Sequence, residues 1–361
     1  MRIKLLCLGV LVTQSKSESM NSNVLNEVTL SQWMTANIDG FAGPIEISKF
    51  AGGQSNPTFK ISTPNKNYVL RRKPMGTLLP GAHSVDREYR IISALGKTGF
   101  PVPQTYGICD DDNVIGSMFY VMEMVEGRIF WNQSFAEIPQ SERFAYFDAM
   151  NQVLARLHGI GYKAIGLGDY GKEGQFVERQ IKLWTRQYLA DEDAGRNPDM
   201  DRLIAWLPQN IPTFDETTII HGDYRSDNMV FHPTEPRIIA VLDWELSTLG
   251  NPLADFTYHL MAYHMPQGWP SSVKGIDYSA FGLPTEQQSI DAYLRRTGRQ
   301  NIENISFYVA FNMFRLAAIL HGIKGRLIRG NAANKDAAKM VERFDELAHH
   351  AWLQAVAAGA K

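Results

Sequence analysis

The sequence predicts an α+β protein of two lobes, a small antiparallel β-sheet lobe with one main helix and a larger, mainly helical lobe. Short β-patterned runs separated by turns occupy much of residues 45–124. After Gly127, apolar residues recur at spacings of three and four, as on amphipathic helices. Two short apolar runs within this helical part end beside acidic residues. We therefore place the first lobe at residues 20–125 and the second at residues 126–361.

The composition is that of an ordinary globular protein, with 44% hydrophobic and 20% charged residues in 361. The 36 basic and 38 acidic side chains almost cancel, which argues against a nucleic-acid or membrane partner. Cys7 and Cys109 are too few for a disulfide framework and suit a reducing compartment, so we expect a cytoplasmic protein. The sequence leaves the oligomeric state open.

The N-terminus has a charged start followed by an apolar run of about eight residues, a pattern that superficially resembles a signal peptide. The run is at the low end for a signal peptide, has no A-x-A-like cleavage site after it, and is too short to span a membrane. We therefore expect residues 1–19 to be a disordered tail or a mis-assigned start, with Met20 as the working start.

Turn-forming residues separate the elements expected in the first lobe. The segments 52–57 and 63–67 are rich in Gly, Pro, Asn and Ser, and they divide three β-patterned runs. One helical pattern precedes these runs and another follows them. The expected helices cover residues 29–37 and 84–95, and the expected strands cover residues 45–50, 58–62, 68–71 and 119–124.

Helical periodicity dominates the second lobe. The apolar residues Phe144, Phe147, Met150, Leu154 and Leu157 form one face of a long amphipathic helix. The same type of pattern predicts helices at residues 141–158, 175–188, 199–207, 307–323 and 336–357.

The stretch from His221 to Asn228 interrupts this helical pattern with polar residues at a fixed short spacing. Asp223 and Asn228 are separated by four residues, and the apolar run 238–242 ends at Asp243. A buried strand that stops at an acid delivers its carboxylate to an exposed strand end. We therefore expect two carboxylates and one amide to serve one site.

These groups suit phosphoryl transfer from ATP, which depends on positioning and on neutralising phosphate charge, usually with Mg²⁺. Asn228 and Asp243 offer the hard oxygen ligands that Mg²⁺ prefers. Asp223 is then available to take a proton from an attacking hydroxyl, a step worth about 10²- to 10⁴-fold in rate.

The Asp-x-x-x-x-Asn spacing matches the catalytic loop of kinases. With His221-Gly222-Asp223, Asn228 and Asp243, the chain resembles the aminoglycoside phosphotransferase and choline kinase-like superfamily, which has a protein-kinase-like fold. More narrowly, it resembles the branch that includes kinase-like domains fused to acyl-CoA dehydrogenases. The likeness extends over about residues 40–330.

The resemblance implies catalytic roles for four residues. Asp223 would be the base, and Asn228 and Asp243 would bind Mg²⁺. Arg225 would contact the transferring phosphoryl group or an anionic part of the acceptor, the alternative being a solvated loop side chain. His221 is expected to support the loop by hydrogen bonding.

The resemblance also implies an ATP site in the first lobe. Gly52, Gly53 and Ser55 would form the phosphate turn, where missing or small side chains let backbone N–H groups approach the phosphates. Arg71 would contact phosphate from its strand, and Glu88 on the next helix would orient it. Met122 would be the gatekeeper, and the backbones of Glu123 and Val125 would contact the adenine. Two features depart from the family: Arg71 replaces the usual Lys, and the turn is not G-x-G-x-x-G.

Chain length indicates a small-molecule hydroxyl as the acceptor. Only about ten residues separate Asp243 from the next helix near Pro252, and neither D-F-G nor A-P-E flanks them, so an activation segment of a protein kinase has no room.

Local charge argues against a polycationic aminoglycoside, which needs an acidic pocket. Residues 262–361 contain 12 Lys and Arg against 8 Asp and Glu. We expect Arg315 and Phe311 to belong to a basic and apolar acceptor wall suited to a hydroxyacyl-CoA or another anionic or apolar acceptor. An aminoglycoside or choline-like kinase is the alternative, and a nucleotide-binding pseudokinase or scaffold is the alternative of another class.

Overall fold

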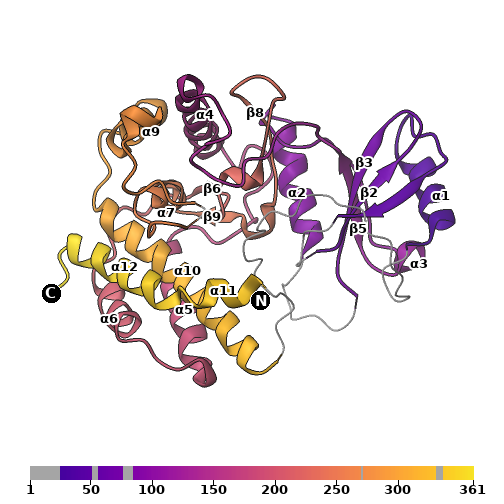
Figure 1. The fold of residues 1–361 in the computed structure, drawn as a ribbon. Helices are drawn as coiled ribbons and strands as arrows, with labels where there is room; N and C mark the ends of the chain where they lie inside the picture. Colours follow the sequence, from indigo (N-terminus) through magenta and orange to yellow (C-terminus); the bar gives the residue numbers. More distant parts are fainter. Residues whose placement is uncertain (1–24, 51–55, 76–83, 270, 331–335) are drawn as a thin grey trace. The chain divides into compact units, whose positions relative to one another are not determined.

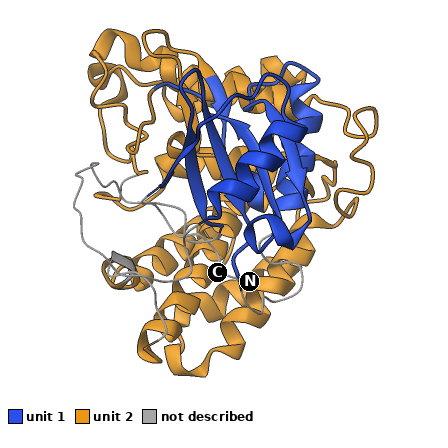
Figure 2. Cartoon of the chain, turned by 90° about the vertical axis from the view of Figure 1, so that its right-hand side faces the viewer, with its two compact units in different colours: residues 1–127, 239–245 blue, residues 128–238, 246–361 orange. Residues whose placement is uncertain are grey.

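The structure is a computed structural model that describes residues 25–50, 56–75, 84–269, 271–330 and 336–361 (Figure 1). The expected tail and the phosphate-turn residues Gly52, Gly53 and Ser55 lie outside these ranges. The chain forms two compact units, which are coloured separately in Figure 2. The first contains Met1–Gly127 and Ile239–Glu245, and the second contains Arg128–Ile238 and Leu246–Lys361.

The first unit contains a five-stranded antiparallel sheet in the order β1-β2-β3-β5-β4. Four of its strands match the sequence prediction, but β4 was not predicted. A register shift between Thr105 and Gly107 disturbs the alternation of β4, which explains its weak sequence pattern. The strands are β1 (Glu46–Lys49), β2 (Thr58–Ser62), β3 (Asn67–Arg72), β4 (Thr105–Cys109) and β5 (Phe119–Glu123).

Successive residues of a strand point to opposite faces, and the two faces of this sheet contact different helices. Helix α1 (Glu27–Asn37) packs Leu30 and Met34 into the apolar cluster that includes Leu70 and Val121. Residue 71 of β3 faces the other way, towards α2 (Val85–Gly96), which Figure 1 shows across the sheet from α1. The short helix α3 (Asp112–Ile115) completes the unit.

A segment distant in sequence also belongs to the first unit. The Val241 N–H of β8 (Ile238–Val241) donates to the Pro101 carbonyl at 2.8 Å. The fully buried Trp244 packs edge-on against Phe100, with ring centroids 6.0 Å apart. The sequence boundary at residue 126 did not anticipate this return of residues 239–245, which places Asp243 in the same unit as β3.

The second unit is mainly helical and is organised around α10. This helix contacts α5, α7 and α12, and Figure 1 shows it beside α12. By length and composition α10 could cross a membrane, but 78% of its apolar window is buried inside the protein, as in a core helix. The α-helices of the second unit are α4 (Gln140–His158), α5 (Phe176–Ala190), α6 (Pro198–Trp206), α7 (Pro252–Leu260), α8 (Tyr278–Phe281), α9 (Glu286–Thr297), α10 (Ile305–Ile328), α11 (Asp336–Val341) and α12 (Phe344–Ala357).

One predicted helix, at residues 336–357, is in fact the two helices α11 and α12. The chain turns at Arg343, whose guanidinium donates to the Gln267 carbonyl at 2.9 Å and to Glu346 at 2.8 Å. These tertiary contacts are invisible to helical periodicity, which runs across the break.

Short strands in the second unit frame the stretch around Asp223. Strand β6 (Thr218–Ile220) pairs antiparallel with β9 (Thr248–Gly250), and β7 (Met229–Phe231) follows the stretch. All three residues of β6 are buried, so the chain enters the polar stretch from a fixed position.

Candidate active site

The loop after β6 is attached to helix α7 through Asp255. The backbone N–H groups of His221 and Gly222 donate to its two carboxylate oxygens at 2.8 and 2.9 Å. Burial opposes the charge on Asp255, but His158, at 3.3 Å, and these N–H donors hold the pKa of the carboxyl below its ordinary value. Asp255 is therefore a tether of this loop, and Asn251 caps the helix.

Gly222 is required by the shape of the loop. Its φ of +81° lies in the left-handed region, and a Cβ atom would be 2.8 Å from the Leu246 carbonyl oxygen. The next residue, Asp223, donates its N–H to Nδ1 of His221 at 3.2 Å. His221 therefore supports the loop by hydrogen bonding, as the sequence predicted.

The Asp223 side chain is held by two residues that follow it in the chain. Asn228 donates from Nδ2 to the Asp223 carbonyl at 2.8 Å and to Oδ2 at 3.1 Å. The hydroxyl of Tyr258 on α7 donates to Oδ1 at 2.6 Å. Sequence reasoning missed Tyr258, because an aromatic residue in an apolar helix has the same pattern whether it faces a core or a site.

Arg225 is bonded within the loop. Its Nη2 donates to Asp227 at 2.6 Å, and its Nε lies 3.3 Å from Oδ1 of Asp223. The side chain is only 14% exposed, which contradicts the alternative of a solvated loop arginine. Contact with a phosphoryl group or an acceptor stays a prediction.

The first unit carries a cation surrounded by acids. Arg71 places Nε 2.9 Å from Glu88 and Nη2 3.1 Å from Asp243 and 3.4 Å from Glu245. Burial disfavours its charge, but these carboxylates outweigh that effect and hold the pKa of Arg71 above its usual range. The predicted Arg71–Glu88 ion pair is present, whereas Glu245 was missed although it lies two residues after Asp243.

Asp243 has an unusual backbone for a residue other than glycine. Its φ is +65°, two residues after the last residue of β8. The left-handed region costs such a residue about 1–2 kcal/mol, and strained positions of this kind cluster at functional sites. The sharp turn follows Val241 in sequence and brings the carboxylate to Arg71.

The donor atoms fit a hard cation such as Mg²⁺. Both Asn228 bonds to Asp223 use Nδ2, so its carbonyl oxygen is the atom suited to a metal. Asp243 offers carboxylate oxygens. Within the described ranges, no group of three or more His, Cys, Asp or Glu is placed to hold a metal ion.

The predicted adenine-contacting residues lie at the end of the sheet. Met122 is buried in β5, Glu123 ends that strand, and Val125 follows it partly buried. The Glu123 side chain accepts the Gln104 N–H at 3.1 Å, which fixes this end of the strand. The roles of the three residues towards a nucleotide stay predictions.

The predicted acceptor wall on α10 is wrong. Phe311 is fully buried, because α10 is the core helix of its unit. Arg315 is 8% exposed, donates from Nη2 to the Gly222 carbonyl, and lies 5.1 Å from the centre of the Tyr258 ring. Arg329, which follows the last residue of α10, is paired with Asp191 at 2.7 Å, so its charge is already compensated.

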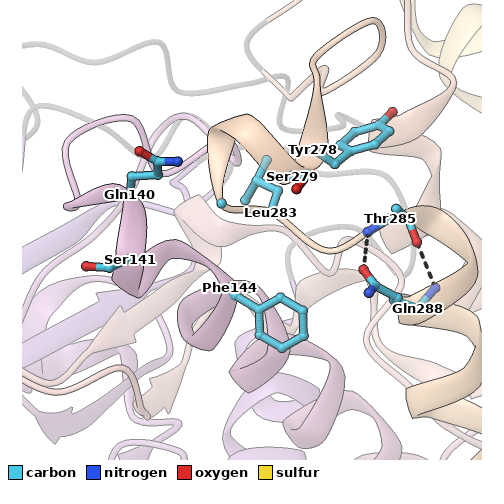
Figure 3. A pocket seen from close by; sticks show the side chains of 9 residues that line it. Gln140, Ser141, Phe144, Tyr278, Ser279, Leu283, Thr285 and Gln288 are labelled. Atoms are coloured by element: carbon cyan, nitrogen blue, oxygen red, sulfur yellow. Dashed lines mark hydrogen bonds between the residues drawn. The ribbon is translucent and has the colours of Figure 1, made fainter.

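A separate pocket of about 500 Å³ lies among α4, α8 and α9 (Figure 3). Several of its polar groups already have partners: Gln140 donates to the Ala280 carbonyl, and Thr285 and Gln288 form a capping box. None of the lining residues is among those that contact Asp223. The pocket is lined by Gln140, Ser141, Phe144, Tyr278, Ser279, Gly282, Leu283, Thr285 and Gln288.

Comparison with known proteins identifies the family. The sequence profile of the phosphotransferase enzyme family, APH, matches residues 46–293. The chain belongs to this family. The match confirms the predicted resemblance and the relationship to small-molecule phosphotransferases.

Curated relatives are longer than this chain. It is 43% identical to mouse acyl-CoA dehydrogenase family member 10 over 86% of its own length and 29% of the relative's. It is 40% identical to chicken acyl-CoA dehydrogenase family member 11 over 93% of its length and 44% of the relative's. The chain thus spans less than half the length of each of these relatives.

Solved structures confirm the kinase-like α+β fold. A Ralstonia eutropha protein provisionally named an aminoglycoside phosphotransferase is 46% identical, with a TM-score of 0.85 over 92% of this chain and 99% of that one. A spectinomycin phosphotransferase in complex with ADP and spectinomycin has a TM-score of 0.60 over 92% and 99% of the chains. At 11% identity, the second likeness shows the fold alone.

Proposed function

We propose that this chain transfers the γ-phosphoryl group of Mg-ATP to a hydroxyl group of a small molecule. The observation that carries the proposal is Asp223, a loop carboxylate held by Tyr258 and Asn228 in a phosphotransferase-family chain. Bound Mg-ATP would supply the phosphoryl group and neutralise charge during its transfer.

Asp223 takes the proton of the acceptor hydroxyl in this proposal. The Asp223 carbonyl accepts a hydrogen bond from Asn228, and the Asp223 N–H donates one to His221. These two bonds fix its backbone, so the carboxylate is positioned before the acceptor arrives. Asn228 through its carbonyl oxygen and Asp243 through its carboxylate would hold the metal. We also infer a cytoplasmic location, because two cysteines suit a reducing compartment. Cell fractionation would test this location.

Arg71 would bind phosphate through a part of the guanidinium that the acids leave to it. Glu88, Asp243 and Glu245 contact Nε and Nη2, and we assign the phosphate contact to Nη1. A guanidinium offers five donors where the Lys usual in the family offers three. The substitution is therefore compatible with one residue serving both the acids and a phosphate.

The acceptor we favour is a hydroxyacyl-CoA. This choice rests on relatives 37–43% identical that are named as acyl-CoA dehydrogenases, since the charge argument from α10 does not survive. An aminoglycoside is the alternative, favoured by the name of the 46% identical Ralstonia protein, and a choline-like alcohol is a further one.

An acceptor screen tests the proposal. The chain is incubated with Mg-ATP and separate hydroxyacyl-CoAs, choline-like alcohols, sugars and aminoglycosides, and products are analysed by mass spectrometry. We expect a phosphate adduct on a hydroxyacyl-CoA, with ADP formed in equal amount and no adduct from Asp223→Asn. Nucleotide binding without any adduct, together with equal background hydrolysis in both proteins, would instead identify a pseudokinase.

A further inference from the structure

Helix α7 holds the catalytic loop at two points one turn apart. Asp255 accepts the N–H groups of His221 and Gly222, and Tyr258 donates its hydroxyl to Oδ1 of Asp223 at 2.6 Å. Residues three apart lie on the same face of a helix, so one face of α7 fixes both the entry of the loop and the carboxylate. The first contact sets the backbone, and the second acts directly on the proposed base.

The Tyr258 ring is itself held in place. The Arg315 guanidinium lies 5.1 Å from the ring centre and donates to the Gly222 carbonyl. Burial and then the Asp223 charge raise the pKa of Tyr258, so its hydroxyl keeps its proton and remains a donor. The contact to Oδ1 is thus part of a built arrangement that includes both helices, α7 and α10.

The donors are distributed unequally over the two oxygens of Asp223. Oδ1 accepts the Tyr258 hydroxyl and lies 3.3 Å from Nε of Arg225, whereas Oδ2 accepts one bond, from Nδ2 of Asn228. Each carboxylate oxygen has about two lone-pair directions. Oδ1 therefore has one hydrogen bond and an adjacent cation, which both disfavour a proton there, whereas among the described residues Oδ2 has one donor and keeps a direction for a proton.

We propose that Tyr258 is a positioning residue for phosphoryl transfer, whose hydroxyl occupies Oδ1 of Asp223 so that Oδ2 receives the proton of the acceptor. This inference rests on the proposed function. In the step, the acceptor oxygen forms its bond to the γ-phosphorus as its proton moves to Oδ2. The bond from that phosphorus to the β–γ bridging oxygen breaks, and its electron pair leaves with ADP.

The first test compares Tyr258→Phe with the matched control Tyr263→Phe. Both remove one hydroxyl from a buried ring, but the Tyr263 hydroxyl donates to the Pro284 carbonyl, away from Asp223. With the acceptor identified by the screen, we expect Tyr258→Phe to lower kcat about 10- to 100-fold, as for a lost bond to a charged group. KM for ATP should change less than about threefold, and Tyr263→Phe should keep wild-type kcat.

A double-mutant cycle separates positioning from general support of the fold. If Tyr258 acts through the carboxylate, adding Tyr258→Phe to Asp223→Ala should change the residual single-turnover rate less than about twofold. The inference would be overturned if Tyr258→Phe lowered the rate equally in the wild-type and Asp223→Ala backgrounds, or if Tyr258→Phe alone left kcat unchanged or raised it. In either case, transfer by the wild-type chain would leave the proposed function standing. Absence of transfer by the wild-type chain to every acceptor would overturn both.

Discussion

Arg71 and Asp223 each lie at the centre of a group of polar partners, but the two groups differ in what holds them together. Arg71 is one buried cation that serves three carboxylates, Glu88, Asp243 and Glu245. Asp223 is one carboxylate that accepts directed hydrogen bonds from Tyr258 and Asn228, with Arg225 nearby as an ion-pair partner. The first group depends on charge compensation and the second on hydrogen-bond direction.

This difference predicts different consequences of substitution. Removal of the Arg71 guanidinium takes its positive charge away from three poorly solvated acids, which costs folding free energy. The Asp223 carboxylate is 19% exposed and can be replaced by an amide of the same shape with little change in packing. The first group should therefore respond in stability and the second in rate.

The largest effect is expected from Asp223→Asn. Loss of the base should lower kcat by about 10²- to 10⁴-fold, while thermal unfolding and ATP binding stay as in the wild type. Steady-state kinetics with calorimetric unfolding and nucleotide titration measure the three quantities. A turnover near that of the wild type would remove Asp223 from the role of base.

Arg71→Met should mainly affect stability. It removes the positive charge next to the buried Glu88 and the partly buried Asp243 and Glu245, and we expect a loss of about 3–5 kcal/mol in the free energy of unfolding. The neighbouring Arg72→Met is the matched control, since Arg72 faces the other way and its pKa is lowered by burial, whereas carboxylates raise the pKa of Arg71. Equal losses in denaturant unfolding of the two variants would contradict the charge-compensation account.

Asp255→Asn should destabilise the second unit by about 1–3 kcal/mol at neutral pH. The substitution replaces one of the two oxygens that accept backbone N–H groups with an amide NH2 group, which can only donate. The folded-state pKa of Asp255 is depressed, so its contribution is present above the unfolded value of about 4 and is lost as the pH falls through the folded value. Denaturant unfolding at several pH values should show the difference from wild type shrinking below about pH 4. A constant difference would contradict the tether.

His259→Gln should produce the smallest effect, a change in pH dependence. Burial lowers the pKa of His259 from 6.5 to about 4, so the neutral ring favours the fold. Stability should be fully present above pH 6.5 and fall as the pH approaches 4. In His259→Gln, unfolding should depend less on pH within this window. An identical slope for variant and wild type would show that the ring does not couple to folding.

Local patterns in the sequence determined much of this protein. Strand alternation puts Arg71 on one face of its sheet, and the pair with Glu88 that the family resemblance implied is present. The spacing from Asp223 to Asn228 identified a loop that closes on itself by a hydrogen bond between those residues. Such features depend on residues a few positions apart, whose geometry the backbone period fixes.

Only the tertiary structure decided which distant residues join these groups. Residues 239–245 return to the first unit, which brings Asp243 and Glu245 to Arg71. Sequence reasoning missed Tyr258 and expected Arg315 at an acceptor wall, yet both contact the loop of Asp223. The physical reason is that helical periodicity identifies a buried face but not the element it is buried against, and packing alone makes that choice.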